Sequence, residues 1–185
     1  MDLLILVTLG TQDKQFTRLL KAIEEQVKKG LIKDKIIVQA GHTKFKSKYM
    51  KILKLIPMEQ FDKLISECDV LITHGGVGSI ITGLKYNKKV IAAARLSKYN
   101  EHENDHQLQI IETFVNDGYI LELNDFDKLN EKIKESKKFK SKKFKNDNKV
   151  MKKIVNDYIS NNEISTFRFL LPFIIILVLL IIIFI

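Results

Sequence analysis

VLITHGGVGS, residues 70–79, joins a short apolar run to a glycine-rich turn. The apolar residues are of the type that forms a buried strand, and the spacing after the turn predicts a helix over residues 80–86. Glycines at a strand-to-helix turn let the backbone approach an anion closely, while the exposed amides and the helix dipole stabilise negative charge. A diphosphate is a suitable ligand, and Ser79 can add a hydroxyl donor. Taken alone, the pattern is equally compatible with a tight connection that binds nothing.

The alternation of strand and helix continues on both sides of this turn. Apolar runs predict strands over residues 3–8, 36–39, 52–56, 70–73, 89–93 and 119–123, and helical spacing predicts helices over residues 13–29, 57–68, 80–86, 105–116 and 125–136. This order predicts an α/β fold, a doubly wound parallel sheet with helices on both faces. Such sheets bind ligands at the carboxyl ends of their strands, where a second glycine turn at Gly10 and Thr11 would also lie.

Three segments of the chain together resemble glycosyltransferase family 28. Residues 73–79 (THGGVGS) are similar to the His-(Ala/Gly)-Gly-x-Gly-Ser loop of its C-terminal domain, and residues 7–11 (VTLGT) to its opening strand and loop. Residues 101–107 (EHENDHQ) are similar to its Glu-His-x-Asp-(Asn/Asp)-His-Gln motif, with Asn104 in place of the usual aspartate. The order and spacing match small members of the family, subunits of the eukaryotic dolichol-linked UDP-N-acetylglucosamine transferase and of bacterial exopolysaccharide galactosyl- and glucosyltransferases.

The resemblance implies a single Rossmann-like GT-B donor-binding domain over residues 1–127. It implies an inverting transfer from a UDP-sugar donor to a polyprenyl-diphosphate-linked sugar acceptor, without a metal or other cofactor. A GT-B site is a cleft between two α/β domains, so a membrane-associated partner subunit would carry the acceptor-binding half. The general base is left unassigned, and no catalytic residue is named in this chain.

The resemblance also implies a set of donor-binding residues. The glycine turn would meet the UDP diphosphate, the first turn would approach the same phosphates, and the third segment would reach the sugar and ribose, with Glu101 or Glu103 on the ribose hydroxyls. The set comprises Gly10, Thr11, His74, Gly75, Gly76, Gly78, Ser79, Glu101, Asn104, Asp105, His106 and Gln107.

Two other functions remain open from the sequence. His102-Glu103-Asn104-Asp105-His106 is a literal His-Glu-x-x-His, the pattern of zinc hydrolases, with Glu122 or Glu131 as a third ligand. This segment lies at a predicted helix start rather than inside an amphipathic helix, and Gln107 completes the transferase motif instead. The other alternative is a helper subunit that binds a nucleotide sugar, or stabilises a transferase, without turnover.

Positive charge is concentrated toward the C-terminus. Residues 128–153 hold twelve lysines against three acidic residues, an excess equal to the net charge of +9 of the whole chain. These lysines belong to a predicted helical linker over residues 128–166 and can contact anionic lipid headgroups. No interleaved pattern of aromatic residues for base stacking supports a nucleic-acid partner, so none is expected.

The last segment, residues 167–185, is predicted to be a transmembrane helix. Residues 169–185 carry no charge and are almost entirely Ile, Leu, Phe and Val. A spanning helix needs ~20 apolar residues, so the length is just adequate, and a core helix is rarely apolar around its whole circumference. The preceding lysines favour the cytoplasmic face for the main domain. The lone Cys68 excludes an intrachain disulfide and agrees with a reducing compartment.

Overall fold

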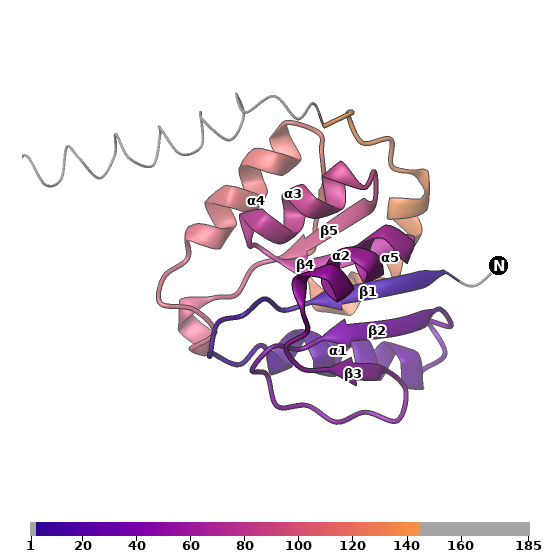
Figure 1. The fold of residues 1–185 in the computed structure, drawn as a ribbon, viewed down its shortest axis with the longest axis vertical. Coiled ribbons are helices and arrows are strands. Elements are labelled where there is room, and N and C mark those ends of the chain that lie inside the picture. Colours follow the sequence, from indigo (N-terminus) through magenta and orange to yellow (C-terminus); the bar gives the residue numbers. More distant parts are fainter. Residues whose placement is uncertain (1–2, 145–185) are drawn as a thin grey trace, which may run out of the picture. The chain divides into compact units, whose positions relative to one another are not determined.

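Six parallel strands form one sheet in the computed structural model, which describes residues 3–144 of the chain (Figure 1). The strands are β1 (Leu4–Thr8), β2 (Lys35–Gln39), β3 (Lys51–Leu53), β4 (Val70–His74), β5 (Lys89–Ala93) and β6 (Leu121–Glu122). Their order is β3-β2-β1-β4-β5-β6, and all neighbouring pairs are parallel. The predicted doubly wound sheet is confirmed, with the strand order of a Rossmann fold.

Helices cover both faces of the sheet. They are α1 (Thr17–Lys28), α2 (Met58–Glu67), α3 (Val77–Lys85), α4 (His106–Asn116) and α5 (Leu129–Lys138), with short 3-10 turns at η1 (Ser97–Tyr99) and η2 (Phe126–Lys128). Figure 1 shows α2, α3 and α4 in front of the sheet and α1 and α5 behind it. The two layers follow from right-handed crossovers, because the chain winds outward in one direction from β1 and in the opposite direction from β4.

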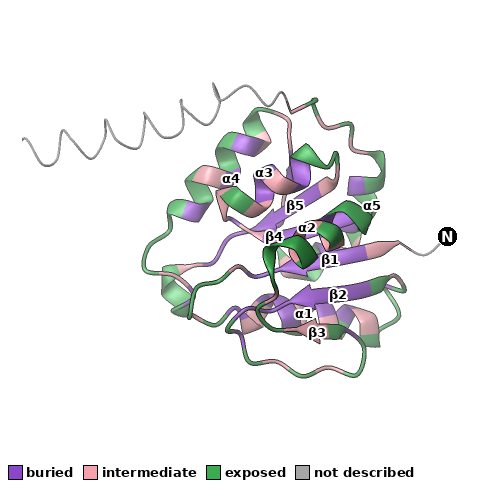
Figure 2. Ribbon diagram, viewed as in Figure 1, coloured by how far each residue is buried: buried purple, intermediate pink, exposed green. Residues whose placement is uncertain are grey.

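The hydrophobic core lies between the sheet and the layer of α1 and α5. Ile5 and Val7 of β1 contribute to it with Leu20 of α1 and Ile133 of α5. Leu6, which points to the opposite face of β1, is buried as well. Figure 2 shows that the central strands are buried along nearly their whole length. Burial on both faces explains why these strands are continuous apolar runs in the sequence.

Several elements begin or end at other residues than the sequence predicts. Helix α1 begins at Thr17 rather than at residue 13, and β3 ends at Leu53 rather than at residue 56. Helix α3 begins at Val77, so the last glycine and the serine of the glycine turn form its first turn. The backbone of residues 9–15 is held by side chains from other elements, as described below, which keeps it out of α1.

Helix α5 extends the domain beyond the boundary that the sequence suggests at residue 127. Its residues Leu129 and Ile133 are buried in the same core as α1, so at least part of the lysine-rich segment belongs to the sheet domain. Within residues 3–144 no helix is long and apolar enough to cross a membrane. The predicted transmembrane helix over residues 167–185 lies outside the described residues.

Candidate functional site

The candidate site lies where the winding of the sheet reverses, between β1 and β4. From β1 the chain passes to α1 on one face, and from β4 it passes to α3 on the other. The Thr8 hydroxyl donates a hydrogen bond to Thr73 Oγ1 at 2.9 Å and ties the two carboxyl ends together. In both predicted glycine turns the first glycine follows the threonine after one intervening residue. Ligands of doubly wound sheets bind in the crevice at this kind of switch point.

The N-terminus of α3 forms one side of this crevice. Gly76 is the N-cap residue and has no side chain, so no side chain among residues 3–144 caps the first-turn amides of α3. An added Cβ on Gly78 would meet nothing within 4 Å, which leaves the approach to these amides open. Unpaired amides at a helix N-terminus combine with the helix dipole to attract an anion. Ser79 lies in the same turn and brings its hydroxyl to it.

His74 lies between the two glycine turns. An ideal Cβ on Gly76 would be 2.4 Å from His74 Nε2, and one on Gly10 would be 2.6 Å from the same atom. Both distances are well below van der Waals contact, so the imidazole occupies the space of two missing side chains. His74 Nδ1 lies 3.4 Å from the carbonyl oxygen of Thr8. The predicted residues Gly10, His74 and Gly76 are therefore brought into direct contact.

The His74 ring is neutral at physiological pH. Burial, first, and the nearby positive charge of Arg95, second, lower its pKa from 6.5 to about 4. A neutral ring can donate through one nitrogen and accept through the other. His74 therefore contributes polarity and shape to the crevice, while positive potential comes from the helix and from Arg95.

The turn after β1 is held by residues that the sequence analysis does not include. Gly10 has a positive φ of 75°, and its carbonyl oxygen accepts from Gln39 Nε2 at 3.2 Å. The buried guanidinium of Arg95 donates to the carbonyl oxygens of Leu9 and, at 3.2 Å, Lys14. The sequence signal for Arg95 is a charged residue directly after a buried apolar strand, but its partners lie too far along the chain to be inferred.

The third predicted segment, residues 101–107, contacts the glycine turn after β4 through its last residue. Gln107 is buried, and its Oε1 accepts from the Arg95 amide at 3.0 Å. An added Cβ on Gly75 would lie 2.7 Å from Gln107 Cβ, so the start of α4 packs closely on the glycine turn. At the other end, Gln12 Nε2 lies 3.2 Å from His102 Nε2.

Two carboxylates of this segment bind other protein groups. Glu101 is 4% exposed, and it accepts from Arg18 Nε at 3.0 Å and from Arg18 Nη2 at 2.8 Å. Asp105 accepts from the Ser97 amide at 2.8 Å, and this hydrogen bond lowers the pKa of Asp105. Both carboxylates therefore shape the loop before α4.

Asn104 and His106 lie on the exposed side of the same loop. Asn104 Oδ1 accepts from the His106 amide at 3.3 Å, and His106 Nδ1 is 3.4 Å from Gln109 Oε1. Both side chains are exposed, as is Thr11 in the turn after β1. These three residues are accessible to a ligand that occupies the crevice.

Comparison with known proteins places this geometry in a family. Residues 4–161 match the glycosyltransferase family 28 C-terminal domain. The chain belongs to glycosyltransferase family 28. The match covers all three of the segments on which the resemblance rested, and it confirms that assignment.

Individual relatives agree with the family. The chain is 43% identical over 56 residues to a UDP-N-acetylglucosamine transferase subunit, ALG13, of Candida glabrata, a match that covers 30% of this chain and 26% of the relative. An NMR structure of ALG13 superposes with a TM-score of 0.51 at 20% identity, covering 77% of this chain and 89% of that chain. The glycosyltransferase of kitacinnamycin superposes with a TM-score of 0.55 at 19% identity, covering 73% of this chain and 34% of that chain. The match thus spans about a quarter of the Candida glabrata relative and about a third of the kitacinnamycin glycosyltransferase.

The geometry of this family 28 chain does not match the zinc-hydrolase alternative. Helix α4 begins at His106, so His102 lies before the helix and not one helical turn away on the same face. His102 Nδ1 is 2.9 Å from the carbonyl oxygen of Asn104. Among residues 3–144, no group of three or more His, Cys, Asp or Glu side chains could hold a metal ion.

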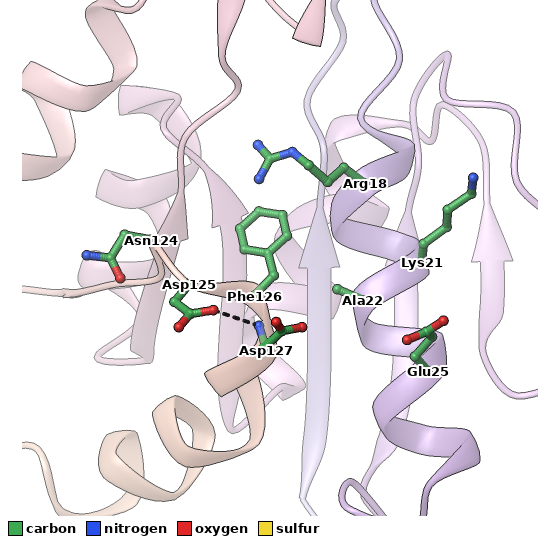
Figure 3. A pocket seen from close by; sticks show the side chains of 8 residues that line it. All are labelled: Arg18, Lys21, Ala22, Glu25, Asn124, Asp125, Phe126 and Asp127. Carbon is green, nitrogen blue, oxygen red and sulfur yellow. Dashed lines mark hydrogen bonds between the residues drawn. The ribbon is translucent and has the colours of Figure 1, made fainter. Parts of the chain in front are cut away.

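A shallow pocket of about 440 Å³ lies elsewhere, between α1 and the turn after β6 (Figure 3). Arg18 extends over the Phe126 ring, with Cζ 4.2 Å from the ring centroid. Lys21 and Glu25 of α1 line one side of the pocket, and Asp125 lines the other. None of the predicted donor-binding residues lines this pocket, so the candidate family 28 site is the crevice between the glycine turns.

Proposed function

We propose that this chain is the donor-binding, catalytic subunit of a two-subunit inverting glycosyltransferase. It transfers a hexose or N-acetylhexosamine from a UDP-sugar to a polyprenyl-diphosphate-linked acceptor. The observation that carries the proposal is the uncapped N-terminus of α3, which faces the Gly10 turn at the switch point of a family 28 domain. The relative named as a UDP-N-acetylglucosamine transferase subunit supports N-acetylglucosamine as the first sugar to test.

The chemistry follows from where charge develops. In an inverting displacement, negative charge builds up on the departing UDP as the acceptor hydroxyl attacks the anomeric carbon. Amides and a helix dipole that are already aimed at that charge stabilise the transition state without reorganisation. The first turn of α3 and the turn at Gly10 provide such groups. This charge stabilisation can take the place of a metal ion, and the acceptor's proton is removed by a base outside this domain.

The acceptor half is proposed to come from a partner subunit. The described residues form one sheet domain, whereas this chain covers 34% of the kitacinnamycin glycosyltransferase. ALG13 is named as a subunit, which supports a partner. We place the complex at the cytoplasmic face of a membrane, with residues 167–185 as the anchor and the acceptor held in the bilayer by its lipid.

The test is a titration of the full-length chain in detergent micelles with UDP, UDP-N-acetylglucosamine, UDP-galactose and UDP-glucose, with and without chelator. Binding of UDP that the chelator does not change, with one UDP-sugar preferred, supports the proposal. Absence of UDP binding, together with one equivalent of zinc that is lost in a His102→Ala, His106→Ala variant, would contradict it.

A further inference from the structure

Arg95 is the most deeply buried charged group of the described domain. It lies two residues after β5, is 1% exposed, and packs against the Phe16 ring with Cζ 5.6 Å from its centroid. Its Nη2 donates to the carbonyl oxygen of Leu9, and its Nη1 donates to that of Lys14 at 3.2 Å. A single guanidinium therefore holds both ends of the turn between β1 and α1.

The contact with Leu9 also fixes the direction of a neighbouring amide. A trans peptide unit is planar and carries its C=O and its N–H on opposite sides. When the Leu9 carbonyl points inward to Arg95, the amide of Gly10 in the same peptide must point outward. Gln39 acts in the same way on the next peptide, because its Nε2 donates to the Gly10 carbonyl oxygen at 3.2 Å, which turns the Thr11 amide outward.

These two amides have no partner within the domain. Among residues 3–144, no backbone or side-chain group accepts a hydrogen bond from the amides of Gly10 or Thr11. Gly10 is also confined by its neighbours, since an added Cβ on Gly41 would lie 2.2 Å from the Gly10 carbonyl oxygen. In the structure the carbonyls of Leu9 and Gly10 are therefore bound inside the domain, and the amides of Gly10 and Thr11 face outward.

Arg95 also lacks full compensation for its own charge. Its Nε has no hydrogen-bond partner in the described domain, and no carboxylate there lies within ion-pair distance of it. The buried carboxylate of Glu101 forms its ion pair with Arg18 and, like that of Asp13, acts on Arg95 only beyond ion-pair distance. A buried charge without an ion-pair partner is costly, and an anion bound at the adjacent turn would lower this cost.

We propose that Arg95 is a positioning residue for the donor diphosphate: by holding the Leu9 carbonyl, it aims the Gly10 amide at a phosphate oxygen. The inference rests on the proposed function, because it takes UDP as the ligand. Arg95 touches neither phosphate nor sugar and acts through the backbone of the turn. Arg95 therefore affects the binding of the donor phosphates and does not affect the binding of the uridine.

The experiment compares UDP with uridine, which lacks phosphates, by NMR titration of the full-length chain in detergent. Arg95→Met removes the charge and the donors, and Arg95→Lys keeps a charge but cannot hold two carbonyls in a fixed fork. Because hydrogen bonds to charged groups are among the stronger ones, both variants are expected to weaken UDP about tenfold and uridine less than about twofold. The Gly10 and Thr11 amide resonances should shift in both.

Gln26 provides a matched control. It is a buried side chain whose Nε2 also holds two backbone carbonyls, those of Phe126 and Asp127, at 2.8 and 3.0 Å. Gln26→Leu should lower the melting temperature, as Arg95→Met does, while the ratio of UDP to uridine affinity stays at the wild-type value.

Equal weakening of UDP and uridine in Arg95→Met would show a general structural role and would overturn the inference. Full UDP affinity in Arg95→Lys would show that charge alone suffices and would overturn it as well. If the wild-type chain binds neither ligand, the proposed function fails. Gly10 and Thr11 resonances that are unchanged in Arg95→Met would then separately refute the role of Arg95 in the turn.

Discussion

The imidazole of His74 fills the space that a side chain at position 76 would need, since a Cβ on Gly76 would lie 2.4 Å from His74 Nε2. The same ring excludes a side chain at Gly10. Gly10 and Gly76, which the sequence connects with phosphate binding, therefore also leave the space that the His74 ring occupies. His74 couples the two turns, so a change in either one is transmitted to the other.

Gly76→Ala should destabilise the domain and weaken UDP binding. The new methyl group overlaps the His74 ring, and overpacking of this kind costs about 1–3 kcal/mol. Thermal unfolding of the full-length chain should show a lower melting temperature. In a His74→Ala background the same substitution should cost less, because the ring is gone. Equal costs in both backgrounds would mean that the ring is not the obstacle.

Stability should fall as the pH decreases from 6.5 to 4. The pKa of His74 is lowered to about 4 in the folded chain, first by burial and then by the charge of Arg95, against 6.5 when unfolded. Between these values the unfolded chain binds more protons than the folded chain. The free energy of unfolding is therefore unaffected by His74 above pH 6.5 and falls progressively below it, by up to about 3 kcal/mol. Thermal unfolding across this pH range measures the slope.

His74→Gln is the control for this pH dependence. It should remove most of the slope between pH 6.5 and 4, whatever its effect on stability at pH 7. The pKa of the Asp105 carboxylate is lowered from 3.8. Its contribution to stability is therefore lost at lower pH than that of His74 and does not produce this slope. A slope that persists unchanged in His74→Gln would assign it to other groups.

Glu101→Gln should lower stability by about 1–3 kcal/mol, because it leaves the Arg18 guanidinium without its buried partner. UDP affinity should stay within about threefold, since the Glu101 carboxylate faces α1 and not the crevice. The double variant with Arg18→Met should cost less than the sum of the single changes. A large loss of UDP affinity with unchanged stability would instead support the ribose contact suggested by the family resemblance.

The alternation of elements was predictable because buried parallel strands and amphipathic helices have different periods in the sequence. The glycine turn after β4 was predictable for a local reason as well, since Gly75 and Gly76 directly follow a strand. The sequence predicts a start for α1 at residue 13, earlier than Thr17, because the polar residues before Thr17 are compatible with a helix. Arg95 and Gln39 bind the backbone of the turn after β1. They come from the loop after β5 and from β2, so these contacts cannot be inferred from local spacing.

The direction of the site side chains was not predictable for the same reason. Glu101 belongs to a motif that suggests a ligand contact, yet Arg18, 83 positions earlier in the chain, holds its carboxylate. Asp105 is likewise taken up by the Ser97 amide. Local pattern identifies which loops meet at the crevice, whereas long-range partners decide which of their atoms remain available.

The central claim is that the N-terminus of α3 binds the donor diphosphate, and a charge placed at Gly78 tests it most directly. This position is open, and an acidic residue near a helix N-terminus favours folding. UDP affinity, measured by calorimetry on the full-length chain, should fall about tenfold or more in Gly78→Asp and stay near wild type in Gly78→Ala. Met58→Asp, which adds the same charge at the first residue of α2, should also have no effect. UDP affinity that is equal in Gly78→Asp and in the wild type would contradict a diphosphate at this helix.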